Sequence, residues 1–189
     1  MYAIDRIDVK NLDGYGTPPI EWARVHDTLF GRLPQEPGAG GPNRHTTWLA
    51  TTDPDGKPHV VPFGALVLDE EIYLCSGEGT RKNRNLHRDP RCTLTVATEP
   101  FDLTVEGRAE RVTDPEALER VAAGFRADGW PATVDGDALT AEFSAPSAGP
   151  PPWAVYRLLP ERVFAFGTAE PYGATRFDLA PRETPGSPR

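Results

Sequence analysis

The stretch that decides the fold is Glu71–Thr98, EIYLCSGEGTRKNRNLHRDPRCTLTVAT. A short β-rich run leads into a polar loop, Ser76–Thr80, and the loop leads into residues 81–88, which carry four positive charges in a helix-like pattern. Asp89-Pro90 ends that segment, and a second β-rich run follows. At the start of a helix the first backbone N–H groups have no partner, and the helix dipole favours negative charge. The order strand, loop, helix and strand therefore predicts an anion site, with phosphate as the expected anion.

Arg81 and Lys82 open the predicted helix, where both side chains can donate charge-assisted hydrogen bonds to a bound anion. A basic cluster on a helix is often only a solvated face, and this interpretation stays open. Two features favour a site. The chain has a net charge of −8, so clustered cations are unexpected, and the small residues before the cluster allow close approach of the backbone. Only three of the 20 basic residues are Lys, so Lys82 stands out as a compact point charge.

Composition narrows the class of protein. A length of 189 residues fits one domain with its own hydrophobic core. The negative net charge argues against nucleic acid or an anionic membrane surface as partner. No apolar run approaches the roughly 18 residues of a membrane span, and the first residues lack the apolar core of a secretory signal. Cys75 and Cys92 lie on predicted strands and are expected to be reduced, which fits a cytoplasmic location. No Cys/His cluster has metal-site spacing, so no metal is expected.

The first part of the chain, residues 1–45, is expected to be an N-terminal extension with one helix. Its first 20 residues are polar and irregular in pattern. Apolar residues then recur at helical spacing over residues 20–33 and predict an amphipathic helix, capped by Thr17 or by Pro18-Pro19. Residues 35–43 are rich in Gly and Pro and are expected to form a loop.

From residue 46 onward the pattern is typical of β-strands. Residues 46–52 predict a strand, Asp53-Pro54-Asp55-Gly56 a turn between antiparallel strands, and residues 59–67 the next strand. Pro62 lies inside that strand and cannot donate to a neighbouring one. It therefore indicates a sheet edge, a bulge, or a place where something other than a strand meets the backbone.

The second half of the chain continues the β pattern. Alternating apolar and polar residues predict a strand over residues 101–112 with one buried face. A helix is expected over residues 114–128, capped by Thr113 or Asp114 and ended by Gly129. The other predicted elements are a mostly irregular segment at 130–152, strands at 153–159 and 163–166, and a frayed tail at 180–189.

These elements predict an α+β, mainly β fold. About six antiparallel strands would close into a small barrel, with the phosphate-site helix between two of them and two further helices at the periphery. The barrel domain is expected to span residues 46–179, with an inserted helix and loop at 114–152.

Five segments, taken in order, resemble the pyridoxamine 5′-phosphate oxidase-like split β-barrels. This family includes flavin- and deazaflavin-dependent oxidoreductases of actinobacteria. The matching segments are WLATTDPDGKPHVVPF, YLCSGEGTRKNRNLHRDPR, LTVEGRAERVTD, VYRLLPERVFAFGT and ATRF. The resemblance covers about Thr46 to Phe177 and implies an antiparallel six-stranded split β-barrel with peripheral helices.

The resemblance also implies a coenzyme site. The positions that hold the coenzyme phosphate match Ser76, Thr80, Arg81 and Lys82, supported by Asn85. The strand that lies along the coenzyme ring matches His59, Val60, Val61 and Pro62. The family binds its coenzyme at a two-fold dimer interface, and the positions that the partner subunit would supply match Phe166 and Arg176.

The implied function is that of an oxidoreductase. The resemblance implies a homodimer that binds coenzyme F420, or alternatively FMN, and transfers hydride to an unsaturated small-molecule acceptor. The coenzyme carries the chemistry, so no catalytic residue is assigned. The ending Thr175-Arg176-Phe177-Asp178 departs from the Arg-Leu-His-type ending of oxidases that act on pyridoxamine phosphate, which predicts a different acceptor. A non-catalytic protein that carries a coenzyme or a hydrophobic ligand is the alternative from another class.

Overall fold

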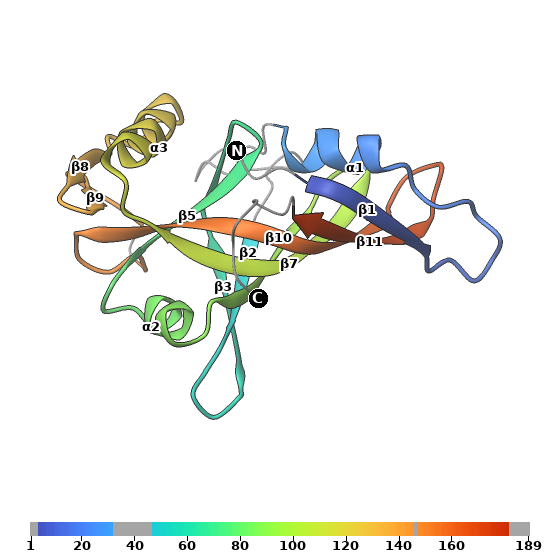
Figure 1. The fold of residues 1–189 in the computed structure, drawn as a ribbon, viewed down its shortest axis with the longest axis horizontal. Helices are drawn as coiled ribbons and strands as arrows, with labels where there is room; N and C mark the ends of the chain where they lie inside the picture. Colours follow the sequence, from blue (N-terminus) through green and yellow to red (C-terminus); the bar gives the residue numbers. More distant parts are fainter. Residues whose placement is uncertain (1–3, 32–46, 146, 182–189) are drawn as a thin grey trace.

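The computed structural model describes residues 4–31, 47–145 and 147–181, and within them the chain forms eleven strands and three helices (Figure 1). The expected loop at 35–43 lies outside the described residues. The helices are α1 (Trp22–Leu29), α2 (Arg81–Arg88) and α3 (Pro115–Ala127). The strands are β1 (Ile4–Asn11), β2 (Thr47–Thr52), β3 (Pro58–Phe63), β4 (Ala65–Leu68), β5 (Glu71–Gly77), β6 (Arg91–Ala97), β7 (Phe101–Val112), β8 (Thr133–Asp135), β9 (Ala138–Thr140), β10 (Trp153–Gly167) and β11 (Ala174–Pro181).

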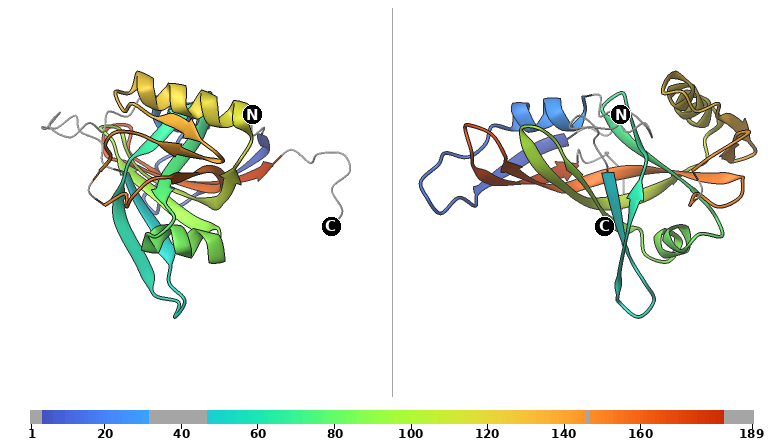
Figure 2. Two further views of the ribbon diagram at one scale, coloured as in Figure 1. Left: turned by 90° about the vertical axis from the view of Figure 1, so that its left-hand side faces the viewer. Right: turned by 180° about the vertical axis from the view of Figure 1, so that it is seen from behind.

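All strand pairs are antiparallel, and the main path of the sheet runs β1-β11-β10-β7-β6-β2-β3. β5 pairs with β10 and carries β4, while the β8–β9 hairpin joins β10 through β9. The sheet does not close, which is the form of a split barrel, so the predicted fold class is confirmed. Figures 1 and 2 show α1 and α3 on one side of the sheet and α2 on the other.

β10 is one continuous strand where the sequence predicted two. Its first half pairs with β5 as far as Leu158, and its second half pairs with β11 from Arg162 onward. Pro160 lies between these two partners, where no strand on that edge needs its missing N–H. The register with β7 shifts between Pro160 and Arg162, and Gly107 lies opposite this bulge. A Cβ on Gly107 would come within 2.1 Å of the Leu159 carbonyl oxygen, so only glycine fits there.

The hydrophobic core has two parts. The main part lies between the barrel strands and α1 and includes Leu49, Leu94 and Phe177, all nearly inaccessible to solvent. The second part packs α3 and the β8–β9 hairpin against β4, β5 and β10, with Leu118 and Leu139 fully buried. The predicted helix at 114–128 is therefore confirmed, and Asp114 caps it by accepting a 2.8 Å hydrogen bond from the Ala117 N–H.

Two segments expected to be irregular are strands. Residues 4–11 form β1, which pairs with β11 at the edge of the sheet. The sequence pattern did not predict this strand because its partner is distant in the chain. Within 130–152, β8 and β9 form a hairpin around Gly136, which has φ +61°. These strands, and a break at Gly64, raise the strand count above the six predicted.

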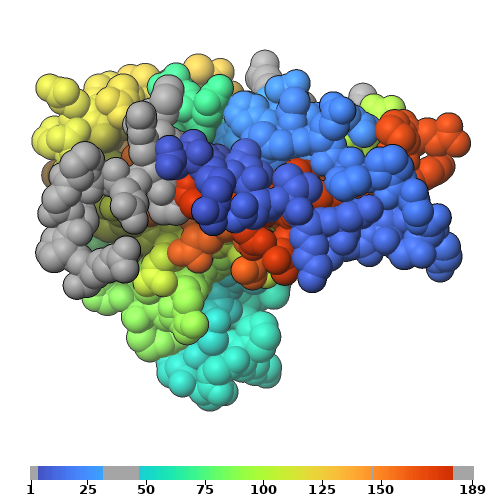
Figure 3. All heavy atoms as spheres, turned by 45° about the vertical axis from the view of Figure 1, so that its right-hand side comes forward, coloured from blue at the N-terminus to red at the C-terminus, as the bar shows by residue number. Residues whose placement is uncertain are grey.

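The break at Gly64 moves the chain between two partners, since β3 pairs with β2 whereas β4 pairs with β5. β3 is the last strand of the main path, so Pro62 lies on an edge strand, one of the three readings of this proline. The β2–β3 hairpin projects from the body of the molecule (Figures 1 and 3).

Helix α1 is shorter than the predicted 20–33 and begins after Glu21, without a side-chain cap. The predicted caps were wrong, because the N–H of Thr17 donates to Asp13 in the preceding loop and Pro18-Pro19 precede the helix by two residues. No helix among the described residues is long and apolar enough to cross a membrane.

Candidate functional site

Helix α2 begins where the sequence predicted, directly after the loop that follows β5. Thr80 is its N-cap, with an extended backbone, and its Oγ1 accepts a 3.3 Å hydrogen bond from the Asn83 N–H. In the part of the chain that the structure describes, the backbone N–H groups of Arg81 and Lys82 have no acceptor. These two donors lie at the positive end of the helix dipole, where an anion can bind them.

The hydroxyls of Ser76 and Thr80 serve the cap. Thr80 donates to the Gly77 carbonyl at 2.8 Å, so the 2.9 Å contact with Ser76 requires Ser76 to donate to Thr80. Gly77 is needed for chain packing, because a Cβ there would come within 2.6 Å of the Ala148 carbonyl oxygen. A Cβ on Gly79 would meet nothing within 4 Å, so the loop is open at this point.

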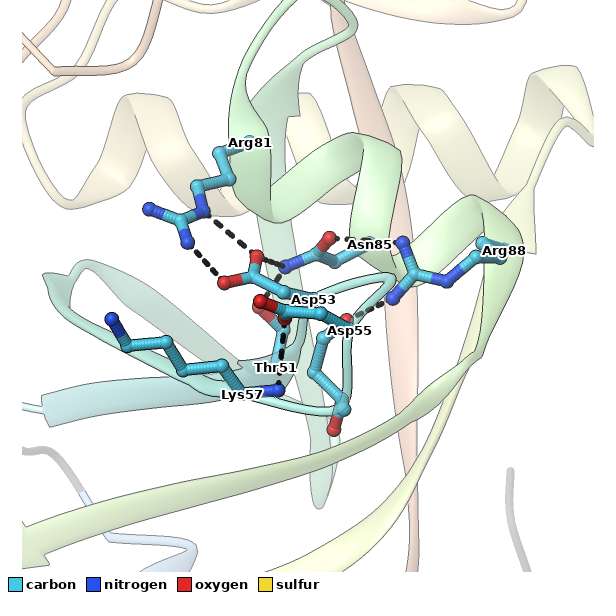
Figure 4. A network of polar contacts seen from close by, with 8 residues as sticks. Thr51, Asp53, Asp55, Lys57, Arg81, Asn85 and Arg88 are labelled. Atoms are coloured by element: carbon cyan, nitrogen blue, oxygen red, sulfur yellow. Dashed lines mark hydrogen bonds and ion pairs between the residues drawn. The ribbon is translucent and has the colours of Figure 1, made fainter.

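Arg81 is held by Asp53, a buried carboxylate directly after β2 (Figure 4). Arg81 donates from Nε to Oδ1 at 2.7 Å and from Nη2 to Oδ2. Asn85 donates to the same Oδ1 at 3.0 Å and to Thr51 Oγ1 at 3.1 Å. The hydrogen bonds from Arg81 and then Asn85 hold the pKa of the Asp53 carboxyl well below its usual range. Arg88 donates to Asn85 Oδ1 at 3.2 Å, so α2 joins the hairpin through residues on one helix face.

Lys82 points to the other side of α2 and is only 8 % exposed. Its Nζ donates to the Ser147 carbonyl at 2.9 Å and lies 5.8 Å from the centre of the Phe63 ring. Burial lowers the pKa of the Lys82 ammonium. Among the described residues it forms no ion pair, so its positive charge has no carboxylate to balance it. A buried cation without an ion pair is a strong anion ligand.

The four candidate residues of β3 divide between two faces of the sheet. Cross-strand neighbours share a face, so His59 and Val61 lie with the buried side chains of β2. Val60 and Pro62 lie on the outer face with Trp48, where Val60 is 53 % exposed. Strand alternation therefore prevents all four side chains from contacting one ligand from the same side.

Phe166 and Arg176 are not near α2 within one chain. They lie on β10 and β11. Trp153 at the start of β10 pairs with Gly77, which precedes α2, whereas Phe166 lies 13 residues further along β10, roughly 40 Å along the strand at about 3.3 Å per residue.

Cross-strand neighbours followed from Trp48 through β6 and β7 lead to Phe164, so Phe164 lies on the same outer face as Trp48. Phe166 is two residues further along the strand, and Arg176 lies opposite Phe164. Both candidates therefore share the outer face with Trp48 and Val60.

The structure brings together Ser76, Thr80, Arg81, Lys82 and Asn85, and it adds Asp53, which the sequence indicated only as a turn residue. Its partner Arg81 is 28 residues away. The local sequence shows only that Asp53 is a carboxylate directly after a predicted strand, and this does not indicate that Arg81 is its partner. Among the described residues no group of three or more His, Cys, Asp or Glu side chains is placed to hold a metal ion.

A cavity of about 490 Å³ lies elsewhere, at the start of β5, lined in part by Trp22, His26 and Glu71. Helix α2 follows the other end of β5, about 20 Å away at 3.3 Å per residue. This cavity is therefore separate from the cluster around α2.

Comparison with known proteins identifies the class. Residues 39–167 match the family described as pyridoxamine 5′-phosphate oxidase. A pyridoxine/pyridoxamine 5′-phosphate oxidase of Ectopseudomonas mendocina is 32% identical over 152 residues, which cover 70% of this chain and 67% of the relative. One of Myxococcus xanthus is 29% identical over 135 residues, covering 61% of this chain and 65% of the relative. The chain therefore belongs to the pyridoxamine 5′-phosphate oxidase-like family.

Solved structures agree on the fold. The conserved hypothetical protein Rv2991 of Mycobacterium tuberculosis aligns with a TM-score of 0.56 at 22% identity, over 82% of this chain and 89% of that one. A putative 5-nitroimidazole antibiotic resistance protein of Bacteroides thetaiotaomicron aligns with a TM-score of 0.52 at 14% identity, over 97% of this chain and 96% of that one. At these identities the likeness concerns the fold alone.

Proposed function

We propose that this protein is an oxidoreductase that binds coenzyme F420 with the coenzyme phosphate at the start of α2, and that it transfers hydride to an unsaturated small-molecule acceptor. The observation that carries the proposal is Lys82, a buried cation that has no ion pair among the described residues and is adjacent to two backbone N–H groups that have no acceptor there. In a family of oxidases, this is the arrangement that an anionic redox coenzyme needs.

The residues present fit such a group. Lys82 and the N–H groups of Arg81 and Lys82 would hold the phosphate, and the open loop at Gly79 leaves room for it. The edge strand β3 would lie along the ring, because the backbone groups on its free edge are available for hydrogen bonds. The bound coenzyme supplies the hydride chemistry, while the chain orients the coenzyme and excludes water.

FMN is the second candidate coenzyme. Flavins are typical of this family, and the relatives that match most of the chain are named as pyridoxine/pyridoxamine 5′-phosphate oxidases. F420 is favoured by the exposed basic side chains of α2, Arg84 and Arg88, which can meet the acidic tail that this coenzyme carries.

The proposed active form is a homodimer in the cytoplasm. The outer sheet face exposes Trp48, Val60 and Phe166 to solvent in the single chain. A two-fold contact through this face would bury them and would bring Phe166 and Arg176 of one copy to the coenzyme of the other.

The test is titration of the purified protein with F420 and with FMN, followed by coenzyme fluorescence. Replacement of Lys82 by Met keeps the apolar stem and removes the charge, and we expect it to weaken binding about 10- to 100-fold, the scale of a desolvated charge-assisted contact. Lys57→Met removes the same charge from the exposed hairpin and should change binding less than about threefold.

Each outcome decides between the candidates. Tight FMN binding without F420 binding refutes the deazaflavin, and binding of neither coenzyme refutes the proposal. Equal effects of the two Lys substitutions show that α2 does not hold the phosphate. Stoichiometric binding without turnover of any conjugated acceptor would identify a carrier protein.

A further inference from the structure

The cavity of about 490 Å³ beside α1 lies apart from the proposed coenzyme site and has a lining of its own. β1 and α1, which lie side by side (Figure 1), form one wall, and the start of β5 and the middle of β10 form the other. Its volume is that of a pocket for a small organic molecule. More than half of the lining residues precede residue 39, where the family match begins. The cavity therefore depends on a segment of this chain that the family match does not cover.

The inner part of the lining is apolar. Ile72 and Leu158 are buried and belong to the main core. Trp22, His26 and Phe30 follow one another at four-residue spacing, so they share one side of α1 and line the cavity together. The ring centroids of Trp22 and His26 are 6.0 Å apart, and those of His26 and Phe30 are 4.8 Å apart. Aromatic rings bind apolar groups and also attract cations to their faces.

Two exposed carboxylates, Glu70 and Asp5, lie at the mouth of the cavity. Oε2 of Glu70 is 3.9 Å from Nε2 of His26, at the outer limit of an ion pair, and the Glu70 side chain is 61% exposed. Asp5 forms no ion pair with any residue that the structure describes. Both carboxylates are therefore open to a ligand that enters the cavity.

The other carboxylate and the arginine of the lining already have partners of opposite charge. Arg6 binds Asp8, with Nη2 2.8 Å from Oδ2. Glu71 is buried and accepts hydrogen bonds from Arg157 at 3.1 Å and from the Tyr73 hydroxyl at 2.5 Å. The formal charges that a ligand meets without a close partner are thus negative, so the complementary ligand carries a positive charge.

The turn that carries Glu70 has an unusual sequence for its backbone. Asp69 and Glu70 alone join β4 to β5, and both have positive φ, 51° and 59°. Two-residue turns of this form favour Asn-Gly or Asp-Gly, because a side chain at the second position costs stability in this backbone region. A glutamate where the turn favours glycine, at the mouth of a cavity, indicates that the carboxylate serves binding rather than the fold.

We propose that this cavity binds a hydrophobic amine, with its apolar part among Trp22, Phe30 and Ile72 and its protonated amino group on Glu70. The buried apolar lining selects the body of the ligand, and the aromatic rings and the open carboxylates select its charge. The inference does not rest on the proposed function, because the cavity lies about 20 Å along β5 from α2.

The experiment uses three probes that share a phenylbutyl group: phenylbutylamine, phenylbutanol and phenylbutyrate. At pH 8 the amine is a cation, because alkylamines titrate near about pH 10, whereas the alcohol is neutral and the acid is an anion. Titrations are followed by the indole N–H signal of Trp22 in proton–nitrogen NMR spectra, which is identified by its loss in Trp22→Phe. The signal of Trp130, which does not line the cavity, is the reference.

We expect the amine to shift the Trp22 signal with a dissociation constant of about 1 mM or below, the scale for a ligand of this size. The alcohol should bind about threefold more weakly and the acid about tenfold more weakly, because the ion pair is partly exposed. The ratio of dissociation constants, acid over amine, removes the contribution of the shared apolar group.

Variants of the turn test the carboxylate. Glu70→Gln should lower the ratio from about 10 to about 3 or below, and Glu70→Lys should bring it below about 1. Asp69→Asn removes a neighbouring carboxylate that does not line the cavity, and it should change the ratio less than about twofold. Glu70→Gly should lower the ratio and raise Tm by up to about 2–4 °C, because glycine suits the turn. A Glu70 that served only the fold would lose Tm instead.

The outcomes separate this site from the coenzyme site. No response of Trp22 at about 10 mM amine, a wild-type ratio of about 1 or below, or an unchanged ratio in Glu70→Gln overturns the proposal. Glu70→Gln should bind F420 and FMN as the wild-type protein does, so loss of one site is measured independently of the other.

Discussion

The two faces of the β2–β3 hairpin differ in burial. Residues of the same chain cover the side chains of the inner face, whereas large apolar side chains of the outer face are exposed to solvent. On the inner face Leu49 is fully buried in the core, and Thr51 is tied to α2 through Asn85. On the outer face Trp48 is 43% exposed and Val60 53% exposed, although both are large and apolar. Alternation along a strand predicts one buried and one polar face, and here the outer face is not polar.

This difference separates what a single chain completes from what it does not. The proposed phosphate site, with Lys82, Arg81 and Asp53, is assembled on the inner side within one chain. The outer face continues across β6 and β7 to Phe164, but Thr95 and Thr104 lie on it between Trp48 and Phe164, so the exposed apolar side chains form separate groups. Exposed apolar side chains that lie together, as Trp48, Val60 and Pro62 do on the hairpin, are typical of protein interfaces. If the proposed function holds, we therefore expect one chain to anchor the coenzyme and a second copy to be needed to complete the ring pocket.

The largest expected effect is a loss of stability, compared between two adjacent residues that lie on opposite faces of the hairpin. Leu49→Ala should lower the free energy of unfolding by about 2–5 kcal/mol, because it leaves a cavity in the core. Trp48→Ala removes a larger side chain from the next position, yet it should lower the free energy by less than about 1 kcal/mol where the chain is monomeric. Urea unfolding over a dilution series measures both. Equal losses at the lowest protein concentration would show that the chain itself supports Trp48.

A charge on the outer face should act on assembly instead of folding. Trp48→Glu places a carboxylate in the middle of the proposed interface, and we expect the dimer dissociation constant to rise at least about 100-fold, since an unpaired charge is costly to bury. Sedimentation velocity measures the dissociation constant. Ala123→Glu on the exposed side of α3 is the matched control and should leave it unchanged. A wild-type protein that is monomeric at all concentrations contradicts the interface outright.

Local signals in the sequence predicted α2 to the residue. A loop of small polar residues and Asp89-Pro90 as a stop lie within about a dozen positions, and the helix spans residues 81–88 as expected. Thr80, which the resemblance assigned to the coenzyme phosphate, is the cap of this helix. Helix α3 was found for the same reason, from Asp114 and Pro115. The Asp135-Gly136 turn was an equally local signal for the β8–β9 hairpin, and the sequence analysis missed it.

What the sequence could not predict depends on distant residues. β1 is a strand because β11, more than 160 residues later, offers an edge. Asp53 reads as a turn residue until α2 brings Arg81 to it. The division of His59 and Val60 between opposite faces follows from alternation, but which face meets α2 is known only from the fold. The sequence thus indicated the residues of the candidate site that lie on α2, but it did not indicate Asp53 or how the residues of β3 divide between the two faces of the sheet.

The smallest expected effect concerns Thr80, at the boundary between the fold and the anion site. Thr80→Val keeps the shape of the side chain and removes the hydroxyl that caps α2, which should lower the free energy of unfolding by about 1 kcal/mol. Thr80→Ser keeps the hydroxyl and should retain most of that stability. For a chain of this size, loss of about 1 kcal/mol lowers Tm by about 2–4 °C, which differential scanning calorimetry resolves.

The same pair of variants distinguishes capping of α2 by the Thr80 hydroxyl from direct binding of the coenzyme by it. The Thr80 hydroxyl already donates to Gly77 and accepts from Ser76 and Asn83, so its hydrogen-bonding capacity is filled. Thr80→Val should therefore weaken coenzyme binding only as far as it loosens α2, and less than Lys82→Met does. If Thr80→Val weakens binding as much as Lys82→Met at unchanged stability, the hydroxyl must turn from the cap to the phosphate when the coenzyme binds. The inner face would then be rearranged by its ligand rather than formed in advance.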